Sequence, residues 1–127
     1  MTDSQRTITG GCLCGGVQYR VTGKLRGVIN CFCGQCRRIS GHHFAATRAS
    51  LNDFELGSDK TLSWYDSSHK ARRGFCSHCG SSLFWQRHDL DTISITAGTI
   101  DPPTGLVTID NIYVDEASDY QIIPELK

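Results

Sequence analysis

The sequence has no excess of charge of either sign and no long apolar run. Its 13 Lys and Arg residues are balanced by 13 Asp and Glu residues. This balance argues against broad, non-specific binding to nucleic acid, which requires a surplus of basic residues. No segment approaches the roughly 20 consecutive apolar residues that form a membrane-spanning helix. We therefore expect neither nucleic acid nor a membrane as a partner.

The N-terminal residues Met1–Thr7 contain no apolar run after their charged residues, so we expect no secretory signal. Low-complexity tracts, linker-like composition and internal repeats are also missing from the sequence. The chain of 127 residues is long enough for one hydrophobic core, which predicts a single domain over residues 1–127. The expected location is the cytoplasm, where thiols stay reduced.

Cysteine is the residue type that stands out, with seven in the chain. An odd number cannot pair completely in disulfides. Close groups of cysteines separated by long gaps are typical of metal-binding turns, and three such groups are present. The groups are a C-x-C pair at Cys12 and Cys14, a C-x-C-x-x-C run at Cys31, Cys33 and Cys36, and a C-x-x-C pair at Cys76 and Cys79.

The two cysteine pairs predict one closed metal site. Zinc binds thiolates in tetrahedral geometry, and each pair places two sulfurs on one side of such a centre. Glycines beside the pairs allow the backbone to turn tightly around a metal. We therefore predict a structural zinc bound by Cys12, Cys14, Cys76 and Cys79. The alternatives for these cysteines are buried, inert thiols or a redox pair.

The remaining cysteines, Cys31, Cys33 and Cys36, predict a second zinc with three protein ligands. Three ligands and one open position characterise catalytic zinc sites. The open position can accept water or a substrate thiol, whose pKa the metal would lower so that the thiolate attacks an electrophile. Because this site lacks a fourth thiolate, we expect it to lose its metal more easily than the closed site.

Three other interpretations of the second cluster stay open at this stage. An imidazole from His42 or His43 would close the site as a structural zinc. A metal-free cluster would form a reversible disulfide, and the C-x-C and C-x-x-C pairs could also be exchanged between the two sites. The other histidines, His69, His78 and His88, are isolated and are interpreted as surface or structural residues.

Basic residues flank the cysteine groups. Arg37 and Arg38 directly follow Cys36, and Arg72 and Arg73 lie shortly before Cys76. Guanidinium groups offset the negative charge of a zinc with three thiolates and bind carboxylates bidentately. The hypothesis is that Arg37 and Arg38, with Arg72 or Arg73, hold an anionic ligand that carries its own thiol. The alternative for each residue is a solvated charged surface.

The secondary structure predicted from the sequence is mainly β. Short segments are rich in β-branched and aromatic residues and are punctuated by glycines. The only helix expected is Gly34–Ser40, with Gly41 ending it. The fold class is therefore a sandwich or folded sheet assembled around metal. The expected strands are Val17–Val21, Thr61–Tyr65, Gly80–Gln86, Thr92–Thr96 and a late strand at Ile112–Val114, with a turn at Asp101–Pro103.

Three segments resemble the signatures of a known family. They are Gly11–Tyr19, Cys31–Gly41 and Gly74–Phe84, each built around one cysteine group. Together they resemble the glutathione-dependent formaldehyde-activating enzyme family, whose domain is also found in vertebrate centromere protein V. Ala97–Pro102 and Ile112–Glu116 resemble later segments of this family, so the resemblance covers the chain from about residue 7 to 120.

The resemblance implies curved antiparallel sheets assembled around zinc, a fold shared with a small exchange-factor chaperone of Rab GTPases. It implies the same division of the cysteines into a structural and a catalytic-type zinc site. It also implies that glutathione and formaldehyde combine to S-hydroxymethylglutathione, with Cys33 able to contact the glutathione sulfur. One position departs from the pattern, because Phe32 stands where many relatives have His.

Two classes of function follow from these observations. The first is a zinc-dependent carbon–sulfur lyase-type enzyme that joins a thiol such as glutathione to a small aldehyde such as formaldehyde. In that hypothesis Cys31, Cys33 and Cys36 carry the chemistry, and Arg37 and Arg38 bind the thiol substrate. The alternative is a non-catalytic, zinc-stapled binding module or a thiol or redox sensor. A concave cavity at the second cluster would favour the enzyme.

Overall fold

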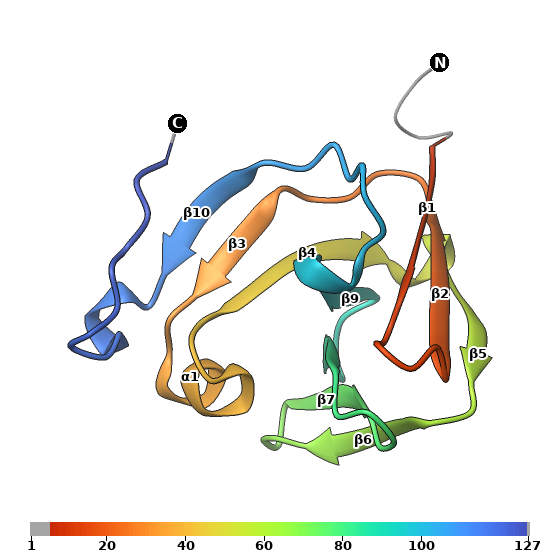
Figure 1. The fold of residues 1–127 in the computed structure, drawn as a ribbon, viewed down its shortest axis with the longest axis horizontal. Coiled ribbons are helices and arrows are strands. Elements are labelled where there is room, and N and C mark those ends of the chain that lie inside the picture. The colour runs from red at the N-terminus through yellow and green to blue at the C-terminus, as the bar shows by residue number, and fades with distance from the viewer. Residues whose placement is uncertain (1–5, 127) are drawn as a thin grey trace.

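The computed structural model describes residues 6–126, which form two β-sheets (Figure 1). A three-stranded sheet has the order β1-β2-β5, and a seven-stranded sheet has the order β10-β3-β4-β9-β8-β7-β6. The strands are β1 (Thr7–Gly11), β2 (Val17–Thr22), β3 (Val28–Cys31), β4 (Phe44–Ser50), β5 (Phe54–Asp59), β6 (Leu62–Asp66), β7 (Ala71–Cys76), β8 (Ser82–Arg87), β9 (Thr92–Thr96) and β10 (Thr108–Ile112).

The helical elements within residues 6–126 are short. One α-helix, α1 (Gly34–Ser40), lies between β3 and β4, and three 3-10 turns span Leu51–Asp53, Ala97–Thr99 and Val114–Glu116. No helix in this part of the chain is long and apolar enough to cross a membrane. The predicted helix and its end at Gly41 are confirmed, and so are the bounds of the strand Thr92–Thr96.

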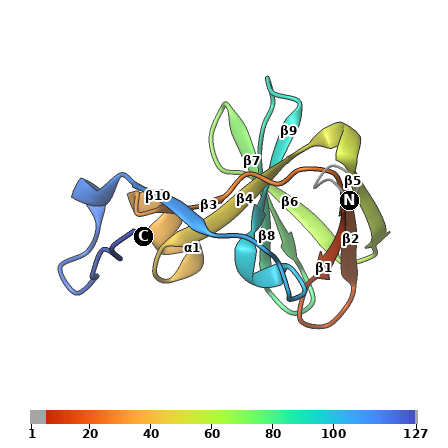
Figure 2. The same ribbon diagram turned by 90° about the horizontal axis from the view of Figure 1, so that it is seen from above.

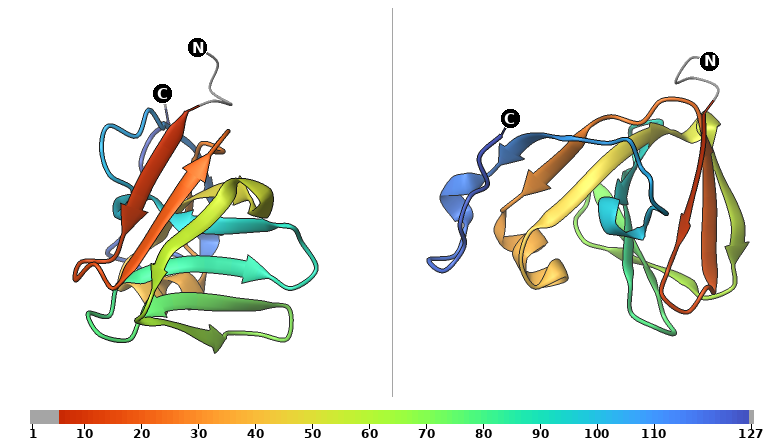
Figure 3. Two further views of the ribbon diagram at one scale, coloured as in Figure 1. Left: turned by 90° about the vertical axis from the view of Figure 1, so that its right-hand side faces the viewer. Right: turned by 45° about the horizontal axis from the view of Figure 1, so that its top comes forward.

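The main core lies where the small sheet packs against the large one. Along β2 buried and exposed residues alternate, so Val17, Tyr19 and Val21 face inward. They belong to the same cluster as Phe84 and Ile95 of the large sheet. Figure 3 shows β1 and β2 in front of the strands of the large sheet, which run across behind them. Apolar contact between the sheets therefore supplies the core that this small chain requires.

The second core cluster lies at the other end of the molecule. It contains Cys36, Phe44 and Ala46, with Cys31, Cys33 and Trp85 packed against it. In Figure 2 the helix α1 lies beside β3 and β10, far from β1, β2 and β5. The two cysteine groups predicted to bind metal therefore belong to different cores.

The last strand corrects two expectations. β10 pairs with β3 in parallel, so the seven-stranded sheet is mixed, whereas the other strand pairs within residues 6–126 are antiparallel as the family resemblance implies. The late strand also covers Thr108–Ile112 instead of Ile112–Val114. It ends at Ile112 because Tyr113 adopts a left-handed conformation with φ 55°, which turns the chain out of the extended state and into a 3-10 turn.

Candidate metal centres and active site

The first cluster joins the two sheets. Cys12 and Cys14 lie in the turn between β1 and β2, Cys76 ends β7, and Cys79 lies in the turn before β8. Their four sulfurs lie within 4.8 Å of one another. The Cys12–Cys14 and Cys14–Cys76 sulfur distances are 3.7 and 3.6 Å. A tetrahedron of sulfurs around zinc at about 2.3 Å has edges of about 3.8 Å, so this donor set fits zinc.

Hydrogen-bond donors surround these sulfurs. The backbone N–H of Val17 donates to Cys12 Sγ at 3.2 Å, and the N–H of Cys79 donates to Cys76 Sγ at 3.2 Å. The Ser81 hydroxyl lies 3.2 Å from Cys79 Sγ and, with nearby backbone N–H groups, lowers the pKa of Cys79 to about 5. Such donors stabilise thiolates, which are the form of cysteine that binds metal.

The second cluster is built by the start of α1. Cys31 is the last residue of β3, Cys33 is the N-cap of the helix, and Cys36 lies in its first turn. The Cys33 sulfur accepts a hydrogen bond of 3.3 Å from the backbone N–H of Cys36, as an N-cap side chain does. The three sulfurs lie within 4.8 Å of one another, so the helix start brings them to one point.

No imidazole belongs to this group among residues 6–126. The ring of His42 is 3.3 Å from the amide nitrogen of Gln121, and the ring of His43 packs on Phe32 with centroids 4.9 Å apart. The structure therefore contradicts the alternative in which His42 or His43 supplies a fourth ligand. His69, His78 and His88 are exposed, which agrees with their interpretation as surface residues.

Phe32, the position at which many relatives have His, has no exposed surface. Its ring lies against His43 and is not part of the cavity described next. The side chain at position 32 therefore packs on the side of the cluster that faces away from the cavity. Having Phe rather than His at this position takes no polar group out of the cavity in front of the three sulfurs.

A cavity of about 440 Å³ opens in front of the three cysteines. Its apolar wall includes Phe44, Trp85 and Ile112. The charged residues that line it are all arginines, with no Asp or Glu: Arg26, Arg48 and Arg73. Ligand cavities in proteins have volumes of about 300–1,000 Å³, so the space suits a small molecule, and its charge favours an anion.

Arg26, which precedes β3, lies beside Arg48 of β4. The backbone N–H of Arg26 donates to the carbonyl of Arg48 at 3.1 Å, and the Arg26 guanidinium donates to the Ala46 carbonyl at 3.0 Å. Burial, and then the positive charge of Arg48, lower the pKa of Arg26. Two guanidinium groups that line one cavity without a carboxylate could bind an anion there.

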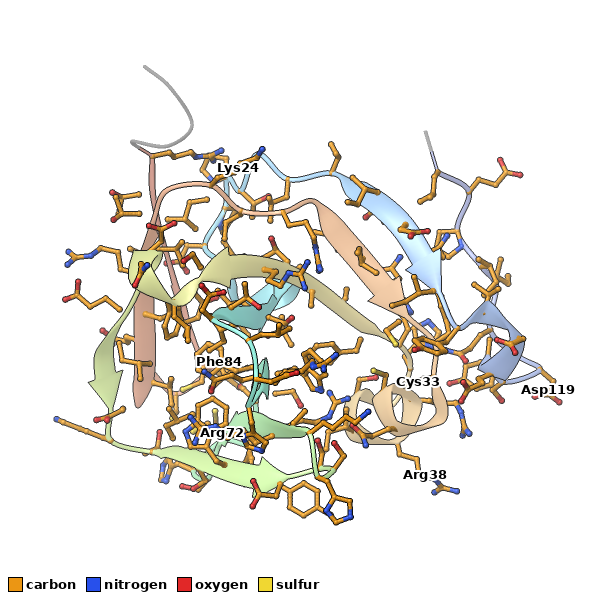
Figure 4. The ribbon with its side chains drawn as sticks, turned by 180° about the vertical axis from the view of Figure 1, so that it is seen from behind. Lys24, Cys33, Arg38, Arg72, Phe84 and Asp119 are labelled. Atoms are coloured by element: carbon orange, nitrogen blue, oxygen red, sulfur yellow. The ribbon has the colours of Figure 1, made fainter. Side chains whose placement is uncertain are left out.

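The arginines singled out from the sequence lie in other places. Arg37 and Arg38 do not line the cavity, and Figure 4 shows Arg38 extending from α1 away from the molecule. Arg72 packs 3.8 Å over the Trp64 ring and donates to Gln86. Arg73 does line the cavity. The sequence hypothesis placed either Arg72 or Arg73 beside the ligand. Sequence reasoning missed Arg26 and Arg48, because neither is close to a cysteine motif.

Arg73 contacts the cluster directly. Its guanidinium donates to Cys36 Sγ at 3.4 Å. The hydrogen bond from the Cys31 thiol lowers the pKa of Cys36, and Arg73 lowers it further against the opposing effect of burial. The same pairing with Cys36, together with burial, raises the pKa of Cys31. The cluster therefore favours a thiolate at Cys36 even before a metal is considered.

Fold and site define a mainly β protein with two cysteine clusters that could hold metal ions, one of them open to an arginine-lined cavity. A model of the glutathione-dependent formaldehyde-activating enzyme family matches residues 7–116, and the chain belongs to this family. The fold is similar to the crystal structure of a Rhodobacter sphaeroides protein from a structural genomics programme. The TM-score is 0.64 at 24% identity, covering 79% of this chain and 97% of that one.

Proposed function

We propose that this protein is a zinc-dependent carbon–sulfur lyase-type enzyme that joins an anionic thiol to a small aldehyde. Glutathione and formaldehyde are the substrates that family membership suggests. One observation carries the proposal: the three-cysteine cluster opens on a cavity whose charged lining residues are all arginines. A thiol that also carries carboxylates complements both parts of this cavity.

Zinc bound by Cys31, Cys33 and Cys36 would hold the substrate thiol in its open position and lower that thiol's pKa, so that the thiolate is available at neutral pH. Arg26 and Arg48 bind carboxylate groups of the same molecule and fix its position. The apolar wall around Phe44 and Trp85 limits the water in the cavity. Because the thiol compound is held at both its sulfur and its carboxylates, its thiolate is already positioned when the aldehyde arrives.

The reaction is an addition without oxidation or reduction. The substrate sulfur forms a bond to the carbonyl carbon, and the electron pair of the carbonyl π bond moves to oxygen. That oxygen takes up a proton, while the thiol has released one, so the atoms balance. The product is a hemithioacetal, and the reverse reaction cleaves the carbon–sulfur bond.

Three observations support an enzyme over a binding module. Phe32 and Phe44 are buried rather than part of an exposed apolar patch. The cluster opens on a concave cavity. It also has no fourth ligand from the protein among residues 6–126. A zinc-stapled binding module requires neither a cavity nor guanidinium groups beside the cysteines. A redox sensor also uses cationic groups beside its cysteines, so the concave cavity is what favours an enzyme over a sensor.

We further propose that both clusters bind zinc, that residues 1–127 form one domain and that the enzyme works in the cytoplasm. The first cluster, Cys12, Cys14, Cys76 and Cys79, is in this proposal the structural site. The similarity of the fold to the exchange-factor chaperone of Rab GTPases remains a prediction from the family resemblance.

The test is the exchange rate between formaldehyde and glutathione, followed by NMR with and without zinc-loaded protein. We expect an excess rate over the uncatalysed reaction that is lost in a Cys36→Ser variant. Arg20→Gln is a matched control, because Arg20 lies on β2 and pairs with Glu55 at the exposed surface. A wild-type rate no greater than the control without protein would contradict the proposed reaction.

A further inference from the structure

Arg73 is the only charged residue that is buried among residues 6–126, with 5% of its surface exposed. It has no carboxylate partner in this part of the chain. The ion pairs found there are Arg20 with Glu55 and Arg87 with Asp89, both at exposed side chains. Burying an unpaired guanidinium is costly, so a buried arginine requires a negative group nearby.

Within residues 6–126, the cysteine cluster supplies the only contact of this guanidinium that can carry a negative charge. One terminal nitrogen of Arg73 donates to Cys36 Sγ, and Nε donates to the side-chain oxygen of Gln35 at 2.9 Å. The other terminal nitrogen is buried without a partner. The guanidinium also lies 5.0 Å from the centroid of the Phe44 ring, which leaves no room for water on that side.

Gln35 holds this arrangement in place from the helix. Its amide nitrogen donates to the Ser67 carbonyl at 3.2 Å while its oxygen accepts from Arg73. The amide is therefore oriented by one contact and orients the guanidinium by the other. Because Gln35 precedes Cys36 in α1, the same turn of helix positions both the sulfur and the group that orients its cationic partner.

The charges balance when a divalent metal is bound. Three thiolates and one divalent cation carry one net negative charge, and the single buried guanidinium offsets it. Without the thiolates the buried guanidinium would have no counter-charge. Without the guanidinium the anionic centre would lie in a partly apolar cavity with a fourth thiolate, that of the substrate, still to be admitted.

We propose that Arg73, oriented by Gln35, is a positioning residue that holds Cys36 as a metal ligand and stabilises the metal in the three-cysteine centre. The inference rests on the proposed metal at this centre and not on the proposed reaction. Arg73 acts through Cys36, so its loss weakens retention of the second metal. It leaves the first metal, at the junction of the sheets, in place.

The test measures the metal content of each variant and the rate of metal release to a chelator. Wild-type protein should hold two zinc ions per chain and release them in two phases. Arg73→Gln should release the second zinc about 10–100-fold faster, the range for a group that supports a metal ligand. Arg72→Gln is the control, since Arg72 neighbours Arg73 on β7 but contacts Trp64 and Gln86.

Arg73→Lys separates charge from geometry. Lysine keeps the positive charge but cannot contact Gln35 and Cys36 with one planar fork, so we expect release rates between those of wild type and Arg73→Gln. Wild-type release from Arg73→Gln would overturn the inference. If Arg73→Gln does not fold, Arg73→Lys decides: faster release of the second zinc alone supports the inference, and any other result overturns it. A wild-type protein that binds only one zinc per chain after loading with excess zinc would overturn the proposed centre as well.

Discussion

At the scale of single residues, the charge of the cavity depends on two arginines that no motif marks. Arg26 precedes β3 and Arg48 lies on β4, and the antiparallel pairing of these strands brings them together. Arg37 and Arg38 are closer to the cysteines in sequence, but the turn of α1 directs Arg38 outward (Figure 4). Distance along a helix is therefore a poor guide to which side chain faces a ligand.

Replacing Arg26 or Arg48 with Gln should weaken binding of the thiol substrate. Each charge-assisted hydrogen bond to a carboxylate is worth about 1.5–3 kcal/mol, so we expect the Kd to rise about tenfold or more. The measurement is titration of zinc-loaded protein with S-methylglutathione, which keeps the carboxylates but cannot react. Unchanged binding in both variants, with weaker binding in Arg37→Gln or Arg38→Gln, would restore the assignment made from the sequence.

Phe32 illustrates a residue whose role the sequence left open. A His between two cysteine ligands has two possible roles, one in catalysis and one in packing. The ring of Phe32 is fully buried behind the cluster and lies against His43, which supports the packing role for this position. Phe32 follows the end of β3 and precedes Cys33, the N-cap of α1. The cavity is lined by Cys31 and Cys33 but not by the Phe32 between them, which agrees with the packing role.

At the scale of elements, α1 is where the sequence was most informative. Its start is fixed by Cys33, whose sulfur caps the helix, and its end by Gly41, which has φ 83°. Both signals are local, so a single sequence contains them. The strands β1, β3, β4, β5 and β7 were not predicted. β1, β5 and β7 contain glycine, β3 has only four residues, and β4 contains three alanines, so none has the run of β-branched and aromatic residues that marks a strand.

Gly41→Ala should destabilise the protein by about 1–2 kcal/mol, since a residue with a Cβ is strained at positive φ. Gly98→Ala is a matched control. A Cβ at either glycine meets nothing within 4 Å, and only Gly41 has a positive φ. The measurement is chemical denaturation at a fixed excess of zinc. An equal loss in both variants would show that the conformation of Gly41 is not the cause.

The parallel pairing of β10 with β3 is the element that sequence patterns could not provide. β10 reaches β3 after a long excursion of the chain, and its residues are mostly exposed, so alternation of apolar residues is lost. Its pairing matters for the site. Ile112 and Tyr113 line the cavity, and Glu116 accepts a hydrogen bond of 3.1 Å from the N–H of Gly34 at the start of α1.

At the scale of the whole molecule, the two clusters have different positions relative to the cores. Cys12 and Cys76 are buried in the main core. Cys12 follows β1 of the small sheet and Cys76 ends β7 of the large sheet, so a metal bound there ties the sheets together. The second cluster lies between β3 and α1 at the edge of the smaller core. The sequence spacing predicted both groups of cysteines, but only the fold reveals that one of them connects the sheets.

This difference predicts unequal effects of losing each metal. Cys14→Ser removes a ligand at an exposed position, so its effect on stability comes from the metal rather than from packing. Structural zinc contributes about 10 kcal/mol or more to small domains, which is comparable to the whole unfolding free energy of a typical protein, about 5–15 kcal/mol. We therefore expect Cys14→Ser to be largely unfolded by far-UV circular dichroism.

Cys33→Ser is the matched substitution in the second cluster. Serine is a good N-cap, so it keeps the hydrogen bond to the backbone of Cys36 while removing a thiolate ligand. We expect this variant to lose one zinc per chain, to keep the far-UV spectrum of the wild type and to lose the aldehyde–thiol activity. Unfolding of Cys33→Ser to the same extent as Cys14→Ser would mean that both metals are structural, and it would remove the basis for an open, catalytic centre.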